Sequence, residues 1–112
     1  MKQYKIVYRD NVGAYLKELA LIVSQQTSLD FAGRYIQRLR SEVENLSFIA
    51  PMLPKSKYLM PLRFHKNATT MTIGHRKLTV IFHIEGEYVI IDKILPSCMI
   101  TYWEYKTKYK LL

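Results

Sequence analysis

Hydrophobic and polar residues alternate near the start of the chain, where YKIVYR (residues 4–9) combines β-branched and aromatic side chains. This alternation predicts a strand. The pattern then changes, and apolar side chains recur every three or four positions from Val12 to Val23, as they do on one face of a helix. Asp10 and Asn11 precede this segment, and we expect them to cap the helix.

A second helical pattern begins near Ser28 or Leu29, and its apolar stripe continues to Leu46. Few residues separate the two patterns, so we expect an antiparallel helix pair. Pro51 and Pro54 disfavour helix in the residues before them, so the second helix should end earlier. The polar residues that fall largely outside its stripe are Arg34, Arg38 and Glu42.

The second half of the chain contains extended candidates. These are LMPLRFHK (59–66), in which Pro61 disfavours an interior strand, and TTMTIGH (69–75). The segment HRKLTVIFHIEGEYVIIDKIL (75–95) then predicts a β-hairpin. Its turn is centred on Glu85-Gly86 or on Gly86-Glu87, and the second pair places glycine first, as a type II′ turn prefers.

Both turns assign the hairpin residues to the same two faces. The first face is apolar (Leu78, Val80, Phe82, Val89, Ile91), and we expect the helices to cover it. The second face is mixed (Lys77, Thr79, Ile81, His83, Tyr88, Ile90, Asp92), and we expect it to be a partly open binding groove.

Length, cysteine content and charge narrow the class of protein. The 112 residues suit one domain, residues 1–112, with a modest core. A single cysteine excludes an internal disulfide, no Cys/His grouping has zinc-ligand spacing, and we expect neither metal nor cofactor. The chain lacks signal-peptide and membrane-span patterns, so we expect a cytoplasmic protein.

The net charge of +8 is unevenly distributed, because every charged residue from Lys55 to Ile84 is basic. A one-sided basic distribution favours a polyanion or an acidic protein as partner. A solvated basic surface that serves only solubility is the plain alternative.

The order of one strand, two helices and three strands, with basic charge and a terminal hairpin, resembles the RelE/ParE superfamily of bacterial type II toxin–antitoxin toxins. The segments that carry the resemblance are YKIVYRDNVGAYLKELALIV (4–23) and RKLTVIFHIEGEYVIIDKIL (76–95). It implies an α+β fold with a small, mainly antiparallel sheet, two antiparallel helices on one face, and the N-terminal strand beside the hairpin. It also implies an antitoxin whose extended, usually acidic segment fills the sheet groove, where we expect it to contact Ile81, Tyr88 and Ile90.

The end of the last strand departs from the superfamily pattern. Many members carry histidine, glycine and arginine there, and in ribosome-dependent nucleases an arginine helps to hold the scissile phosphate. Here the stretch is Pro96, Ser97, Cys98 and Met99, which offers no positive charge. Cleavage by a neighbouring 2′-hydroxyl needs a base, an acid and cations, so other residues would have to substitute. We expect Cys98 to be a small buried thiol rather than a nucleophile.

Substitutes are present elsewhere in the chain. The candidates for catalysis are Lys66, Arg76, His83 and Tyr102, and those for nucleic-acid binding are Lys55, Lys57, Arg63, His65 and Lys77. Each has a plain alternative: His83 as a surface or antitoxin contact, His65 and His75 as solvated histidines, and the lysines as a soluble face. The tail aromatics either pack on the sheet edge or contact RNA (Tyr102, Trp103, Tyr105, Tyr109).

Three functions follow from these expectations. The first is a toxin that cleaves messenger RNA on the ribosome, which the basic region and its histidines favour. The second is a non-enzymatic, ParE-like toxin that binds DNA gyrase, which the missing arginine favours. The third is a non-toxic binding module with the same fold.

Overall fold

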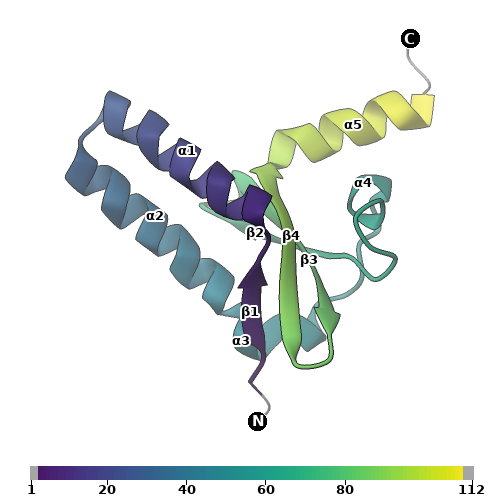
Figure 1. The fold of residues 1–112 in the computed structure, drawn as a ribbon. Coiled ribbons are helices and arrows are strands. Elements are labelled where there is room, and N and C mark those ends of the chain that lie inside the picture. The colour runs from purple at the N-terminus through teal and green to yellow at the C-terminus, as the bar shows by residue number, and fades with distance from the viewer. Residues whose placement is uncertain (1–2, 110–112) are drawn as a thin grey trace.

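The sheet places the first strand of the chain beside the last strand. The computed structural model describes residues 3–109, with side chains as far as Glu104. Its strands run in the order β1-β4-β3-β2, with β1 parallel to β4 and the other pairs antiparallel (Figure 1). The α+β prediction is confirmed, including the position of the N-terminal strand beside the hairpin. The strands are β1 (Lys5–Tyr8), β2 (Thr69–Ile73), β3 (Leu78–Glu85) and β4 (Tyr88–Pro96).

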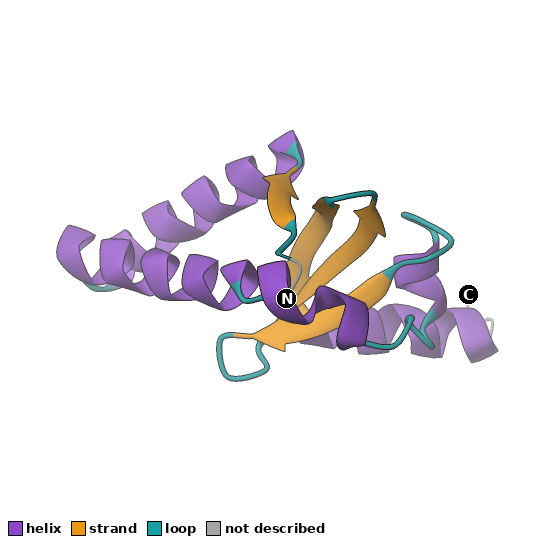
Figure 2. Cartoon of the chain, turned by 90° about the horizontal axis from the view of Figure 1, so that it is seen from below, coloured by secondary structure: helices purple, strands orange, loops and turns teal. Residues whose placement is uncertain are grey.

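Two long helices form an antiparallel hairpin on one face of the sheet, as predicted. They are α1 (Asp10–Gln26) and α2 (Leu29–Glu44). Figure 2 shows the far end of this helical hairpin extending beyond the sheet. The apolar stripes of both helices meet the first hairpin face in the main core, which includes Leu16, Leu39 and Phe82.

The two helix starts differ in how they are capped. Ser28 precedes α2, and its hydroxyl accepts a hydrogen bond from the Phe31 N–H at 3.1 Å, which confirms the predicted start. The expected caps of α1 were wrong, because Arg9 occupies the N-cap position without a side-chain hydrogen bond to the helix. Asp10 lies instead in the first helical turn, where its charge suits the positive end of the helix dipole.

The segment that links the helices to β2 is helical where a strand was a candidate. LMPLRFHK forms the short helix α4 (Leu59–Leu62) and a loop, so the extended interpretation was wrong. Pro61 is tolerated because a residue in the first helical turn has no intrahelical partner for its N–H. The remaining helices are α3 (Leu46–Ile49), the 3₁₀ helix η1 (Ala50–Met52) and α5 (Ser97–Tyr109).

The hairpin turn is centred on Gly86-Glu87, because Glu85 pairs with Tyr88. Gly86 has a φ of +59°, which glycine adopts without steric cost. A β-bulge follows in β4: Ile91 pairs with Phe82, Lys93 pairs with Ile81, and Asp92 between them is unpaired. The bulge shifts the alternation by one residue, so Ile94 joins the main core and Leu95 lies on the second face.

Much of the second face of the hairpin is covered, so the expected groove is open mainly near the turn, where Tyr88 is exposed. Ile81, Leu95, Ala68 and Ile100 form a second buried cluster, with Met60 and Leu62 packed against it. The cover comes from α4, the loop after it and α5, which lie on the side of the sheet opposite the helical hairpin (Figure 1). Apolar residues of these segments bury the strip of sheet that was predicted to be open. Within the described part of the chain, no helix is long and apolar enough to cross a membrane.

Candidate functional site

The main polar cluster of the sheet centres on His83. Its side chain is fully buried in β3, and its Nδ1 lies 2.6 Å from Asp92 Oδ2. Asp92 is equally inaccessible, with 2% of its side chain exposed. A buried carboxylate is costly unless it is paired, so the imidazole and Asp92 stabilise each other.

Asp92 is held from its other side by the start of the chain. Its second oxygen, Oδ1, accepts a hydrogen bond from Arg9 Nε at 2.6 Å, and Asn11 donates its side-chain N–H to the Asp92 carbonyl at 3.3 Å. Arg9 follows β1, which is parallel to β4, so its side chain emerges beside the bulge. The bulge therefore supplies the carboxylate and the N-terminal strand supplies its counter-charge.

Two further groups approach His83 from the solvent side. Glu85 Oε1 lies 3.1 Å from His83 Nε2, and 62% of the Glu85 side chain is exposed. The His65 ring is stacked on the His83 ring, with centroids 3.8 Å apart and planes inclined by 2°. His65 Nδ1 accepts the Asn67 backbone N–H at 3.0 Å. This His–carboxylate cluster is defined by Arg9, His65, His83, Glu85 and Asp92.

The cluster can hold positive charge. Both ring nitrogens of His83 face carboxylate oxygens, and a neutral imidazole has only one N–H to donate. A proton or another cation is therefore needed between His83 and one carboxylate. A side chain with no exposed surface cannot exchange protons with a large substrate, so His83 is poorly placed as a general base.

The proposed catalytic residues do not form one exposed group. His83 is buried, whereas Lys66 and Tyr102 are exposed on the α4–β2 loop and on α5. Arg76 lies in the β2–β3 turn, before β3 begins at Leu78, and His83 is five residues further along that strand. At about 3.3 Å per strand residue, this part of β3 alone spans roughly 16 Å. The expectation that His83 lies on an open face was wrong.

The proposed nucleic-acid ligands divide between two regions. Lys55, Lys57 and Arg63 are exposed in the segment before β2, and the Arg63 guanidinium lies 5.5 Å from the centre of the Trp103 ring. His65 is half-buried in the cluster rather than solvated. Lys77 is exposed at the β2–β3 turn.

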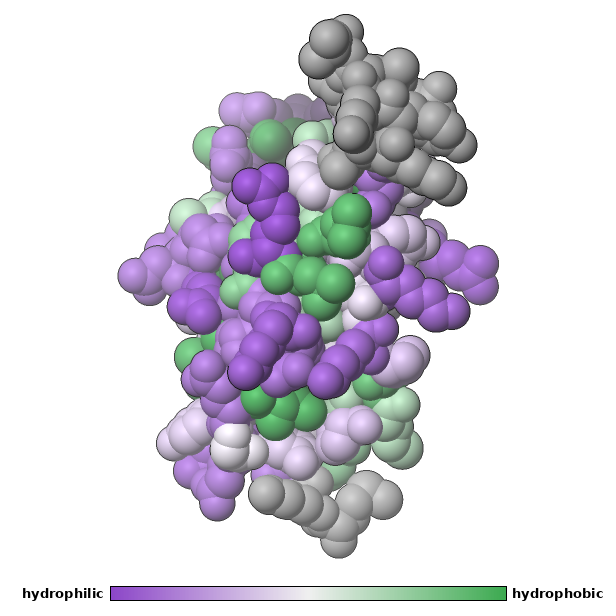
Figure 3. All heavy atoms as spheres, turned by 90° about the vertical axis from the view of Figure 1, so that its right-hand side faces the viewer, coloured by the Kyte–Doolittle hydropathy of each residue, from purple (hydrophilic) through white to green (hydrophobic). Residues whose placement is uncertain are grey.

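The α4–α5 side is rich in exposed apolar groups. Figure 3, which looks at this side, shows hydrophobic groups running between hydrophilic ones. The residues include Tyr58, Leu59, Phe64, Met99 and Tyr102. The side chains of Tyr105 and Tyr109 fall outside the described part.

Cys98 is exposed at the start of α5, so the expectation of a buried thiol was wrong.

The proposed antitoxin contacts differ in accessibility. Ile81 is fully buried under the second cluster, so its expected position on an open face was wrong. Ile90 is half-buried, and Tyr88 is exposed at the hairpin turn, with Lys5 Nζ 6.0 Å from the centre of its ring.

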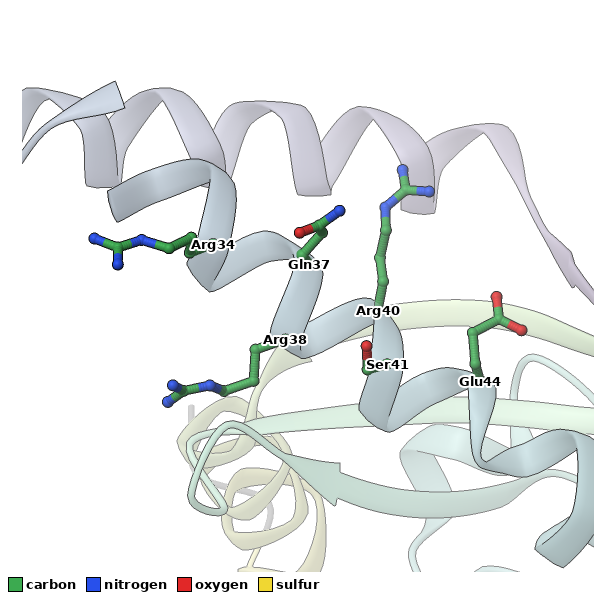
Figure 4. A pocket seen from close by; sticks show the side chains of 6 residues that line it. All are labelled: Arg34, Gln37, Arg38, Arg40, Ser41 and Glu44. Carbon is green, nitrogen blue, oxygen red and sulfur yellow. The ribbon is translucent and has the colours of Figure 1, made fainter. Parts of the chain in front are cut away.

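A basic surface on α2 was missed in the sequence. Figure 4 shows Arg34 and Arg38 pointing to the same side of the helix, whereas Arg40 points toward α1. The β2–β3 turn adjoins this surface, because Glu42 on α2 accepts the Gly74 backbone N–H at 3.2 Å. Arg34 and Arg38 occupy polar positions of the helix and lie outside the charge run between residues 55 and 84. The α2–turn surface consists of Arg34, Arg38, His75, Arg76 and Lys77, all exposed.

The turn in this surface has an unusual backbone. Gly74, His75 and Arg76 have consecutive positive φ values of 59°, 57° and 69°. This conformation is unfavourable for residues with a Cβ atom. Beneath the turn, a pocket of about 230 Å³ is lined in part by Tyr35, Arg38 and Lys77. Positive charge, an unusual backbone and a pocket therefore occur together at the β2–β3 turn.

Comparison with known proteins gives a structural likeness. No protein-family model matches the sequence, and no curated protein matches it. Among solved structures, a chain from the "Chromosomal ParDE TA system from P. aeruginosa" aligns with a TM-score of 0.70 and 14% sequence identity. The alignment covers 86% of this chain and 98% of that chain. The protein therefore has a ParE/RelE-like fold.

Proposed function

We propose that the protein is the toxin of a type II toxin–antitoxin module. The observation that carries the proposal is the fold, which aligns over 86% of the chain with a chain from a ParDE TA system. Exposed apolar side chains add support, because a protein that works in a complex leaves such groups open without its partner. They gather on the α4–α5 side and at the end of the helical hairpin, where Leu29 is 83% exposed.

We further propose that the toxin blocks its target by binding it, as in the ParE-like alternative, with DNA gyrase as the target to test first. The candidate catalytic groups lie apart, and His83 has no exposed side-chain surface. The strand end at Pro96 continues directly into α5, and residues 96–99 carry no cation for a scissile phosphate. The separation of the candidate catalytic groups and the missing cation at the strand end favour binding over phosphodiester cleavage.

Cleavage of messenger RNA on the ribosome is the second candidate. It is favoured by the α4–β2 loop, where exposed Arg63 and Lys66 flank the half-buried His65. In that case Lys66 and Arg63 would contact phosphate, and His65 would be the group able to exchange protons.

The antitoxin is proposed to bind the α2–turn surface instead of the covered hairpin face. β2 is an edge strand, and the isolated bridge from Lys55 reaches only its first residue, Thr69. An extended acidic segment could add to the remainder of β2 by backbone hydrogen bonds. Its carboxylates would then lie beside Arg38, Arg76 and Lys77.

The test is expression of the protein from a tightly repressed promoter, with and without the small acidic protein of a neighbouring gene. Growth arrest that the second protein relieves is expected. Purified toxin should then inhibit supercoiling by gyrase and leave translated messenger RNA intact in primer extension. Breaks in the messenger RNA at ribosomal A-site codons, with fewer breaks in Lys66→Ala, would show that the target is the ribosome and not gyrase. Normal growth at full expression of folded protein would exclude the toxin role.

A further inference from the structure

We propose that His65, His83 and Glu85 form a binding site for a divalent transition-metal ion, with Zn²⁺ as the ion that fits the donors best. One potential ligand atom from each residue lies within 4.8 Å of the other two. Two imidazoles and one carboxylate are a common set of protein ligands for zinc. The inference does not depend on the toxin role.

His83 is prepared to bind through Nε2. Its Nδ1 contacts Asp92 Oδ2 at 2.6 Å, and the Arg9 hydrogen bond fixes the other Asp92 oxygen. A histidine ligand usually donates its second ring N–H to such a carboxylate, which sets the tautomer and orients the ring. With the proton on Nδ1, the Nε2 lone pair is directed at Glu85.

The contact between His83 and Glu85 suits two ligands of one ion. When Nδ1 carries the imidazole proton, both Nε2 and the carboxylate present lone pairs, so a cation must lie between them or the ring must take up a second proton. The two atoms are 3.1 Å apart. Ligands at the usual zinc distances of about 2.0–2.1 Å in a tetrahedron are separated by about 3.3 Å.

His65 would supply the third ligand after a small movement. Its Nδ1 is unprotonated when neutral, because that atom accepts the Asn67 N–H. The lone pairs of two parallel rings do not converge, so the His65 ring must turn out of its stack and exchange the Asn67 contact for the ion. The residue is half-buried in the loop between α4 and β2, where such a turn disturbs little of the core.

Local charge and position both favour an ion. The cluster contains two carboxylates and one guanidinium, so with neutral histidines its net charge is negative and attracts a cation. Three protein ligands leave one coordination position for water, on the side where Glu85 is exposed. The ion would fasten the α4–β2 loop to the end of the β-hairpin, and so hold the cover over the second face.

The experiment titrates the chelator-treated full-length protein with Zn²⁺ by calorimetry. His65→Ala and Glu85→Gln test the site, because both side chains reach the surface and neither change opens the main core. His75→Ala and Glu87→Gln are matched controls at exposed positions outside the cluster. A Cys98→Ser protein controls for zinc binding by the exposed thiol.

One Zn²⁺ per chain is expected, with affinity lowered at least tenfold in His65→Ala and Glu85→Gln and unchanged in the three controls. Zinc should also raise the melting temperature of the unmodified protein and not that of His65→Ala, because an ion bound only to the folded state stabilises it. Absence of saturable binding would overturn the proposal and leave a second proton on His83 as the source of charge. Equal affinity in His65→Ala, or loss in His75→Ala or Cys98→Ser, would overturn it as well.

Discussion

At the scale of single residues, Tyr8 connects the sheet edge to α2. Its hydroxyl donates to Glu44 Oε1 at 3.0 Å, and the Arg40 guanidinium lies 5.6 Å from the centre of its ring. Burial, followed by the hydrogen bond and the negative charge of Glu44, raises the pKa of Tyr8 above its ordinary value of 10.0. The folded protein therefore retains this phenol proton at a pH where the unfolded chain releases it.

Tyr8 thus gives stability a defined dependence on alkaline pH. Its contribution is complete below pH 10 and is lost as the pH rises toward the higher pKa of the folded state. At neutral pH we expect Tyr8→Phe to lower the free energy of unfolding by about 1 kcal/mol, the usual net value of a hydrogen bond. In urea titrations at increasing pH above 10, the difference between the two proteins should shrink. A constant difference would contradict the assignment.

Asp92 is the residue on which the polar cluster depends. Asp92→Asn replaces a buried anion that Arg9 and His83 both contact with a neutral amide. We expect the free energy of unfolding to fall by about 2–4 kcal/mol, as when one partner of a buried charged pair is removed. Urea unfolding measures the loss, and Glu87→Gln in the exposed turn should change stability little. Equal stability of the two variants would show that Asp92 is not buried as an ion.

Residue patterns anticipated only part of this cluster. Alternation along the hairpin correctly assigned His83 and Asp92 to the same face. Neither Arg9 nor His65 could be assigned to it, because Arg9 is 83 positions from Asp92 and no local pattern encodes a contact at that separation. The bulge that leaves Asp92 unpaired is likewise decided by packing on both faces of β4.

At the scale of elements, the cap of α2 is a local feature with a measurable contribution. Ser28→Ala removes the hydrogen bond to the Phe31 N–H and should lower the free energy of unfolding by about 1 kcal/mol. Ser41→Ala, on the exposed side of the same helix, is the matched control and should change stability by less than about 0.5 kcal/mol. Thermal or urea unfolding compares the two. A similar loss in both would mean that the cap contributes nothing specific.

Elements were predicted best where their pattern was long. The helical periods of α1 and α2 and the alternation of β3 and β4 each extend over eight or more residues, and all four elements formed as predicted. The four-residue helix α4 was missed, because so short a segment has no period and its conformation depends on the surface it covers. The expected caps of α1 were wrong because the helix already begins at Asp10, and Arg9 at the N-cap position has a guanidinium without an acceptor, which binds a distant carboxylate instead.

At the scale of the whole molecule, the distribution of basic residues leads to a prediction about the partner. If the acidic antitoxin binds the α2–turn surface, Arg38→Gln with Lys77→Gln should weaken binding at least tenfold. Lys55→Gln with Lys57→Gln also removes two positive charges, but from another exposed region, and should weaken binding much less. Calorimetry with the purified partner at two salt concentrations makes the comparison. Equal losses would indicate attraction by net charge alone.

The sequence by itself determined the class of fold, the two long helices, the hairpin, and the basic character of the molecule. These properties depend on which residue types recur at short spacing along the chain. Such local patterns act in the same way whatever the rest of the chain does. Tertiary structure alone decided which sheet face is open, because α4 and α5 are folded over Ile81 from far along the chain. It also decided the surroundings of His83, because long-range packing brings Arg9 and His65 to the groups that His83 meets within the hairpin, and no spacing in the sequence records that proximity.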